Sequence, residues 1–249
     1  MPLNAADGWG AAELNKTINE FLKKETVDYI GFAKLDNYRE ELADFGGNIV
    51  KGYKYGISIG IAIPNSIVDH LPERFDPNVA CAYKGYCYNI LNTRLNFAAS
   101  KLSSFLNGIG HRTLPISAAD RTGEENAFPS VSHKMIAHIA GLGWIGKNCL
   151  LITPDRGPRV RFISLLTNAP LEAVDNPMEQ RCGSCMECVK SCPPQALKGI
   201  NYASGHPREE RLDFKICQDY FDELKKTMKW DVCGMCLYAC PYGKEMSND

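Results

Sequence analysis

The sequence lacks any long apolar run. No segment approaches the roughly 18 consecutive apolar residues that a membrane-spanning helix needs, so we expect no membrane association. Residues 1–9 lack the basic start and apolar stretch of a secretory signal. A strong charge of either sign is also lacking, because 28 Lys and Arg stand against 29 Asp and Glu. Bulk charge therefore points to neither nucleic acid nor an anionic membrane surface.

Cysteine, by contrast, is abundant. The chain has 11 cysteines, an odd number that argues against a pure disulfide framework. Eight of the 11 lie between Cys182 and Cys240, in tight spacings that end in Cys-Pro. Such spacing is typical of metal ligation, and ligand thiolates persist in a reducing compartment. The cysteines therefore indicate a metal-binding, cytoplasmic protein.

The first group of cysteines has the pattern C-x2-C-x2-C-x3-C and precedes Pro193. In bacterial ferredoxins this run binds one [4Fe–4S] cluster with three thiolates and a neighbouring cluster with the fourth. The second group, C-x2-C-x3-C before Pro241, lacks one member, which Cys217 can supply from upstream. We therefore predict two [4Fe–4S] clusters. The predicted ligand sets are Cys182, Cys185, Cys188 and Cys240 for the first cluster, and Cys192, Cys217, Cys233 and Cys236 for the second.

Zinc is the alternative occupant, because four-cysteine zinc sites also use C-x2-C pairs. Zinc sites do not require two runs that each end in Cys-Pro, and this difference favours iron–sulfur clusters. The three cysteines outside the two groups are predicted to be small, buried apolar side chains. They are Cys81, Cys87 and Cys149.

Helical and strand patterns alternate along the chain as far as about residue 170. This alternation favours an α/β sandwich. Strand patterns disappear before the cysteines begin, so we predict two domains, 1–172 and 173–249. The elements predicted before this boundary are helices over 11–24, 83–106 and 132–140 and strands over 27–33, 55–63, 112–116, 150–153 and 160–167.

A glycine-rich segment, GLGWIGKN, spans residues 141–148 and follows a predicted helix. Its glycines could let the backbone approach a ligand closely, with Lys147 and Asn148 as polar heads. Alternatively, the glycines serve tight turns and close packing.

Trp144 and three arginines also admit two interpretations. Trp144 could stack on a flat cofactor or belong to the core. Arg156, Arg159 and Arg161 surround a predicted turn and could meet a cofactor or face solvent, and solvent is the simpler expectation.

The order of the motifs resembles epoxyqueuosine reductases. AGLGWIGKN precedes a threonine-ended strand, CGSC-x2-C-x3-CP, then Cys217 with Tyr220, then C-x2-C-x3-CP, and the resemblance extends from Ser130 to Gly243. It implies an α/β (α+β) cobalamin-binding, nitroreductase-like sandwich, followed by a small ferredoxin-like double-cluster domain that supplies electrons to base-off cobalamin. The residues that the resemblance places near the corrin are Ser130, Lys134, Gly141, Gly143, Trp144, Gly146, Lys147 and Asn148.

The sequence departs from this family in two places. The family has an aspartate, thought to donate a proton to the substrate, where Ala127 stands here. Glu125 and His133 are the catalytic candidates that could replace it. Family chains also continue past the last cysteines into segments associated with tRNA, whereas the present sequence ends nine residues after Cys240. We therefore expect tRNA to be a weaker partner.

The sequence as a whole predicts an iron–sulfur oxidoreductase resembling epoxyqueuosine reductase. Electrons from an external donor such as ferredoxin or flavodoxin would pass through two clusters to cobalamin and then to a substrate. The alternative is an electron-transfer protein that reduces a corrinoid protein or another small-molecule or protein acceptor, without substrate chemistry of its own. Ala127 favours this alternative, and the glycine-rich segment favours a bound cofactor.

Overall fold

The computed structural model describes residues 9–119 and 130–244. The chain divides into two compact units, each built from separated segments. The first unit contains the segments up to Ile61, 92–142 and 162–178, and the second contains 62–91, 143–161 and 179–249. The cysteine-rich segment thus folds together with two earlier segments that the expected boundary at residue 172 assigns to the other domain.

The first unit is built around a four-stranded sheet with the order β1-β2-β6-β3. β1 (Tyr29–Lys34) pairs antiparallel with β2 (Tyr55–Ala62), and β3 (Thr113–Ile116) pairs antiparallel with β6 (Val160–Thr167). β2 is almost wholly buried, as its continuous apolar sequence predicts. The four predicted strands of this sheet are confirmed, with small shifts at their ends.

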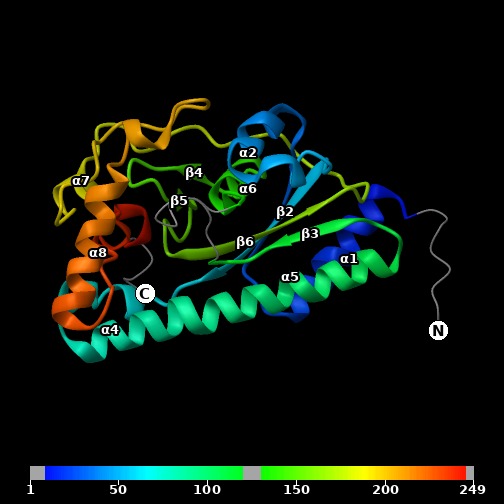
Figure 1. Cartoon of the computed structure of the whole chain (residues 1–249). Coiled ribbons are helices and arrows are strands. Elements are labelled where there is room, and N and C mark those ends of the chain that lie inside the picture. The colour runs from blue at the N-terminus through cyan, green and yellow to red at the C-terminus, as the bar shows by residue number, and fades with distance from the viewer. Residues whose placement is uncertain (1–8, 120–129, 245–249) are drawn as a thin grey trace. The chain divides into compact units, whose positions relative to one another are not determined.

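Helices cover both faces of this sheet. Figure 1 shows α1 (Ala11–Lys24) and α5 (Leu91–Gly108) on one side and α2 (Arg39–Gly46) and α6 (His133–Ile139) on the other. Apolar residues four positions apart form the buried stripe of α1. They are Leu14, Ile18 and Leu22. The first unit is therefore a mixed α/β sandwich, as the sequence predicted.

The long helix expected over residues 83–106 is interrupted. α4 (Pro77–Lys84) is followed by a π-helical segment, Gly85–Ile90, before α5 begins. A π-helical turn widens the helix by one residue and disturbs its periodicity, which an apolar pattern alone does not reveal. α5 ends at Gly108, and Gly110 has a φ of 89°, which explains the predicted stop.

The second unit consists mainly of short elements. β4 (Trp144–Ile145) and β5 (Leu151–Ile152) form a two-stranded antiparallel sheet. α8 (Phe214–Met228) is long by comparison, and Asp213 caps it by accepting a hydrogen bond from the backbone N–H of Ile216. The other helices of this unit, besides α4, are α3 (Asn65–Val68), α7 (Glu187–Lys190) and α9 (Met235–Tyr238).

Single turns of 3-10 helix link many of these elements. They span Asp36–Tyr38, Gly47–Ile49, Leu71–Glu73, Arg208–Glu210 and Pro241–Gly243. Across residues 9–119 and 130–244, the structure contains no helix with the length and apolar character needed to span a membrane.

Candidate metal centre

Four cysteines line one cavity in the second unit. They are Cys182, Cys185, Cys188 and Cys240. This is the set that the sequence assigned to the first cluster, although Cys240 lies far from the other three along the chain. The remaining lining residues are Lys147, Asn148, Ile152, Pro241 and Tyr242.

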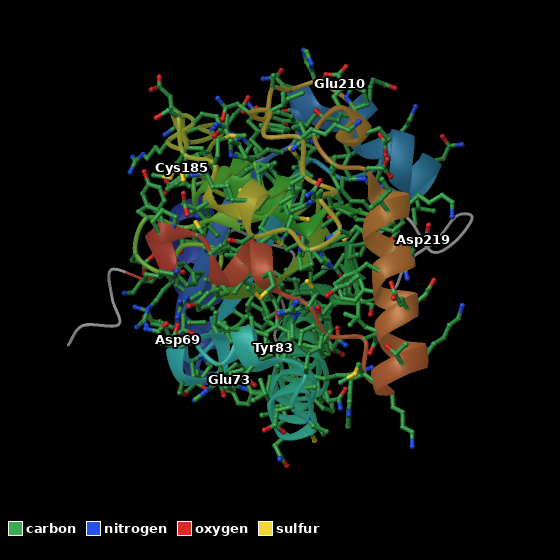
Figure 2. The ribbon with its side chains drawn as sticks, turned by 90° about the vertical axis from the view of Figure 1, so that its left-hand side faces the viewer. Asp69, Glu73, Tyr83, Cys185, Glu210 and Asp219 are labelled. Carbon is green, nitrogen blue, oxygen red and sulfur yellow. The ribbon has the colours of Figure 1, made fainter. Side chains whose placement is uncertain are left out.

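The cysteine spacing explains how the first three thiols converge. The backbone N–H of Cys185 donates to the carbonyl of Cys182 over 2.9 Å, and Gly183 between them has a φ of 51°. This tight turn leads into α7, which carries Cys188, and Figure 2 labels Cys185 in the loop. Cys240 follows α9 and immediately precedes the 3-10 turn Pro241–Gly243. Local backbone geometry thus arranges each group of ligands.

The second predicted set also comes together. Burial raises the pKa of the Cys236 thiol, and the thiols of Cys233, Cys217 and Cys192 raise it further. Such interactions require these four side chains to lie close to one another. Cys188 of the first set contributes as well, so the two sets are neighbours within one unit. That proximity suits electron transfer between two clusters.

Burial favours the protonated form of two thiols of the first set, Cys188 and Cys240. Burial raises the pKa of Cys188 to about 11, and the neighbouring Cys182 and Cys185 raise it as well. Burial likewise raises the pKa of Cys240 to about 12. Because a metal binds thiolates, loading of this site releases protons.

Within residues 9–119 and 130–244, no three His, Cys, Asp or Glu side chains are arranged to hold a single metal ion. All 11 cysteines are described, and none forms a disulfide. The donor set of eight thiols in two adjacent groups of four fits two cubane clusters, each of which takes four thiolates.

Lys147 and Asn148 bind the cysteine loops. The Nζ atom of Lys147 donates hydrogen bonds to the carbonyl oxygens of Gly183 at 2.8 Å and Cys185 at 3.1 Å. Asn148 Nδ2 donates to the carbonyl oxygen of Cys236 at 3.2 Å. Both side chains are buried. The polar heads that the resemblance placed beside a corrin are therefore engaged by the loops that carry cluster ligands.

The other members of the glycine-rich segment pack tightly. Trp144 is fully buried, and its ring meets that of Tyr242 edge-on, with centroids 4.7 Å apart. A Cβ atom on Gly143 or Gly146 would collide with Ile152. Close packing between β4 and β5, one of the two interpretations of this segment, therefore accounts for these two glycines, and Trp144 is a core residue.

Arg159 does not face solvent, and that expectation was wrong. Its side chain is fully buried, where Nη2 forms an ion pair with Asp69 Oδ1 at 2.8 Å and Nη1 donates to Asn65 Oδ1 at 2.9 Å. Arg161 lies over the ring of Tyr88, with its Cζ atom 4.7 Å from the centroid. Both arginines therefore contact residues far away along the chain, and their charge alone does not predict these contacts.

The three cysteines outside the ligand sets divide into two kinds. Cys87 and Cys149 are buried, as predicted, but Cys81 is exposed. α4 carries Cys81 on its solvent face, because Ala80 and Tyr83 are the buried residues of that helix. The prediction of burial for Cys81 was therefore wrong.

The remaining predicted site residues lie in the first unit or outside the described residues. His133 Nδ1 lies 3.1 Å from Ser164 Oγ, and Nε2 lies 3.0 Å from the carbonyl oxygen of Ser117. Both ring nitrogens thus have partners, which accounts for this histidine without a proton-donor role. Ser130, Lys134 and Gly141 are half-buried. The two remaining positions discussed above, Glu125 and Ala127, lie outside the described residues.

Arg74 is a charged neighbour of the second set that the sequence did not single out. Its positive charge lowers the pKa of Cys233, opposing the larger effect of burial, which raises it. Its Nη2 atom donates to the Tyr220 hydroxyl over 3.2 Å. No motif surrounds Arg74, so only the tertiary structure identifies it.

The model of the 4Fe-4S double cluster binding domain family matches residues 181–243. That range contains all eight predicted ligands. The chain is therefore an iron–sulfur protein with a double-cluster domain of ferredoxin type.

Curated relatives extend the comparison beyond the cysteines. The chain is 36% identical over 124 residues to epoxyqueuosine reductase from Listeria monocytogenes, covering 46% of this chain and 30% of the relative. It is 26% identical over 268 aligned residues to the enzyme from Bacillus subtilis, covering 93% and 64% respectively. It is also 27% identical over 200 residues to tetrachloroethene reductive dehalogenase from Sulfurospirillum multivorans, covering 76% and 35%.

Solved structures share the fold. A crystal structure of epoxyqueuosine reductase matches with a TM-score of 0.60 at 21% identity, covering 94% of this chain and 67% of that one. A catabolic reductive dehalogenase matches with a TM-score of 0.71 at 19% identity, covering 98% and 34%. The chain is related to the epoxyqueuosine reductases, as its motifs predicted, and it spans between 30% and 64% of the lengths of the curated relatives named above.

Proposed function

We propose that this protein is an iron–sulfur reductase of the epoxyqueuosine reductase type, with two [4Fe–4S] clusters that supply electrons to a bound cobalamin. The observation that carries the proposal is the cavity lined by four cysteines from two distant parts of the chain. When bound, the clusters supply one-electron transfer and cobalamin supplies a strongly reducing metal centre.

Different residues of the chain would bind the clusters and position the loops that carry the ligands. Eight thiolates would hold the two cubanes, and the adjacency of Cys188 and Cys236 would keep the clusters within reach of each other. Lys147 and Asn148 would hold the ligand loops in place. An external donor such as ferredoxin or flavodoxin would deliver the electrons. We propose a cytoplasmic location, because free ligand thiols persist in a reducing compartment.

The proposal of cobalamin rests on relatives. One solved structure with the same fold, a reductive dehalogenase at a TM-score of 0.68 and 17% identity, is described as dehalogenating with B12, and the match covers 97% of this chain and 33% of that one. Burial of the segment from Gly143 to Asn148 supports a smaller set of proposed contacts. The nitroreductase-like character of the sandwich is part of the same proposal. The proposed corrin contacts that remain are Ser130, Lys134 and Gly141.

The substrate is proposed from the same relatives. Epoxyqueuosine reductase has been solved with an epoxyqueuosine-modified stem loop of tRNA-Tyr, so a tRNA epoxide is one candidate. The Bacillus subtilis enzyme has also been solved with the loop of its catalytic aspartate swung out of the active site. Ala127 lacks such an acid, and this difference supports another small-molecule or protein acceptor.

Ala127 also favours a second function, which is electron transfer to another protein. The chain could transfer electrons to a corrinoid protein and perform no substrate chemistry, since Ala127 cannot donate a proton. The two functions differ in one measurable property, because only the first requires cobalamin to bind this chain.

Anaerobic reconstitution tests the proposal. The purified chain should take up about eight irons and eight sulfides and then change the absorption spectrum of added hydroxocobalamin. Protein that binds zinc in place of iron under these conditions would contradict the clusters. Two clusters without any cobalamin binding would favour the electron-transfer function.

A further inference from the structure

Lys147 is a buried cation beside the cavity of the first ligand set. Its side chain is 6% exposed and lines that cavity together with the four cysteines. Its Nζ atom donates to the carbonyl oxygens of Gly183 and Cys185 and lies 3.7 Å from the Met186 sulfur. No carboxylate pairs with it in the described part of the chain. Its charge therefore faces neutral acceptors and thiols.

A buried charge without a counterion is costly, because the low-dielectric interior stabilises it poorly. A cubane with four thiolates supplies the missing counterion. The thiolate charges outweigh the charge of the iron–sulfur core, and the site becomes more negative on reduction. A nearby cation therefore stabilises the reduced form more than the oxidised form and raises the reduction potential.

The hydrogen bonds give Lys147 a second effect. Gly183 and Cys185 belong to the turn that presents the first two thiols, and glycine adopts the positive φ of this turn at residue 183 without strain. One ammonium group binds two carbonyls of this turn. Lys147 thus orients the loop that carries the ligands, as partners outside the ligand sphere do in other metal sites.

We propose that Lys147 is a positioning residue that holds the Cys182–Cys188 loop and raises the reduction potential of the first cluster through its buried charge. The proposal rests on the proposed function, since it requires that cluster to be present. It assigns the lysine of the glycine-rich segment to the cluster rather than to a corrin.

The experiment is a redox titration of the anaerobically reconstituted full chain, followed by EPR. Lys147→Met removes the charge and keeps an apolar side chain of similar length, and Lys147→Gln keeps a hydrogen-bond donor without charge. Lys190→Met is the matched control, because Lys190 lies on α7 in the same ligand segment but is 70% exposed and paired with Glu187. Cys217→Ala removes a predicted ligand of the second cluster, so the EPR signal that remains in this variant is assigned to the first cluster.

We expect the ratio of reduced to oxidised first cluster, at a fixed solution potential, to fall by about tenfold or more in Lys147→Met and Lys147→Gln. A tenfold change corresponds to ~59 mV for a one-electron couple. The second cluster and Lys190→Met should keep wild-type potentials. A purely structural role would change cluster content without moving the potential of loaded protein.

The possible results separate clearly. Loaded variants with an unchanged first potential would overturn the proposal. Loss of the first cluster from both Lys147 variants would indicate a purely structural role and would also overturn the proposed effect on the potential, as would loss of both clusters. If wild-type chain takes up no [4Fe–4S] cluster, the proposed function itself fails, and this result is distinguishable because it precedes any variant.

Discussion

Asn148 Nδ2 donates a hydrogen bond to the carbonyl oxygen of Cys236 over 3.2 Å, joining the glycine-rich segment to a predicted ligand of the second cluster 88 residues away. Its neighbour Lys147 binds the loop of the first cluster. Two consecutive residues thus contact the loops of both ligand sets. This relationship explains why the segment 143–161, which contains none of the predicted ligands, belongs to the unit that holds all eight of them.

Cys217 is the ligand whose assignment depends most on the tertiary structure. We expect Cys217→Ala to lose the second cluster and retain the first, because the four thiols around the first cavity remain. Iron content should fall to about half of the wild-type value, as measured by iron analysis and EPR. Cys81→Ala is the control, since Cys81 is exposed and lies outside both sets. Two intact clusters in Cys217→Ala would refute the assignment.

Cys81 and Cys87 should differ in reactivity. Burial raises the pKa of Cys87 to about 12, while Cys81 is exposed. Because the thiolate is the reactive form, iodoacetamide at pH 8 should modify Cys81 in cluster-loaded protein and spare Cys87, as read by peptide mass spectrometry. Equal labelling would contradict the burial of Cys87.

The buried thiol of Cys87 should make the stability of the protein depend on pH. The pKa of Cys87 is higher in the folded chain than in the unfolded chain, so the folded state favours the protonated form. Its contribution to the free energy of unfolding is fully present below about pH 9 and is lost as pH rises towards about 12. In Cys87→Ala, urea unfolding midpoints should fall less steeply over this range than in wild type. Equal slopes in both proteins would argue against this contribution.

The buried ion pair between Arg159 and Asp69 should stabilise the second unit. Asp69→Asn leaves the fully buried guanidinium without its anion. Asp69 itself is 40% exposed, so the cost is reduced by solvent, and we expect ~1–3 kcal/mol. The measurement is the free energy of unfolding in urea for cluster-loaded protein. Glu73→Gln is the control, because its side chain is 70% exposed, and a similar loss in both variants would argue against the pair.

We expect cobalamin to bind in the base-off form and without a protein side chain on cobalt, and this expectation rests on the resemblance to epoxyqueuosine reductases. Titration with hydroxocobalamin should change the absorption spectrum and raise the unfolding temperature through preferential binding to the folded chain. Lys134→Ala should weaken this binding, and Lys190→Ala should not. Absence of both the spectral change and the stabilisation would contradict a cobalamin site.

Reduction of epoxyqueuosine in tRNA should be slow. A general acid typically contributes ~10²- to 10⁴-fold, and the resemblance to epoxyqueuosine reductases implies that Ala127 occupies the position of the family's aspartate. An anaerobic assay with epoxyqueuosine-containing tRNA, cobalamin and a strong reductant measures this rate. Ala127→Asp should restore turnover if the substrate is otherwise recognised. Turnover by the wild-type chain equal to that of a family member would refute the prediction, and Glu125→Gln would then identify an alternative donor.

The double-cluster domain and the strands of the four-stranded sheet could be predicted because cysteine spacing and apolar runs are short-range features of the sequence. Two-residue gaps fold one loop around a cluster, and the apolar run of β2 reports burial on both faces. The π-helical segment at Gly85–Ile90 could not be predicted, since its insertion leaves the apolar pattern nearly unchanged. The composition of the units was also hidden, because residues 62–91 and 143–161 contain none of the eight predicted ligands and lie before the expected boundary at residue 172.

The sequence by itself determined the chemistry of this protein, because thiolate spacing and the order of the motifs are local and specific. Only the tertiary structure decided what surrounds that chemistry. Lys147 reaches carbonyls 36 and 38 residues away, and the guanidinium of Arg159 reaches Asn65 across 94 residues. Packing brings these groups together, and burial gives them their strength, since a charge removed from water interacts with its neighbours far more strongly than an exposed one.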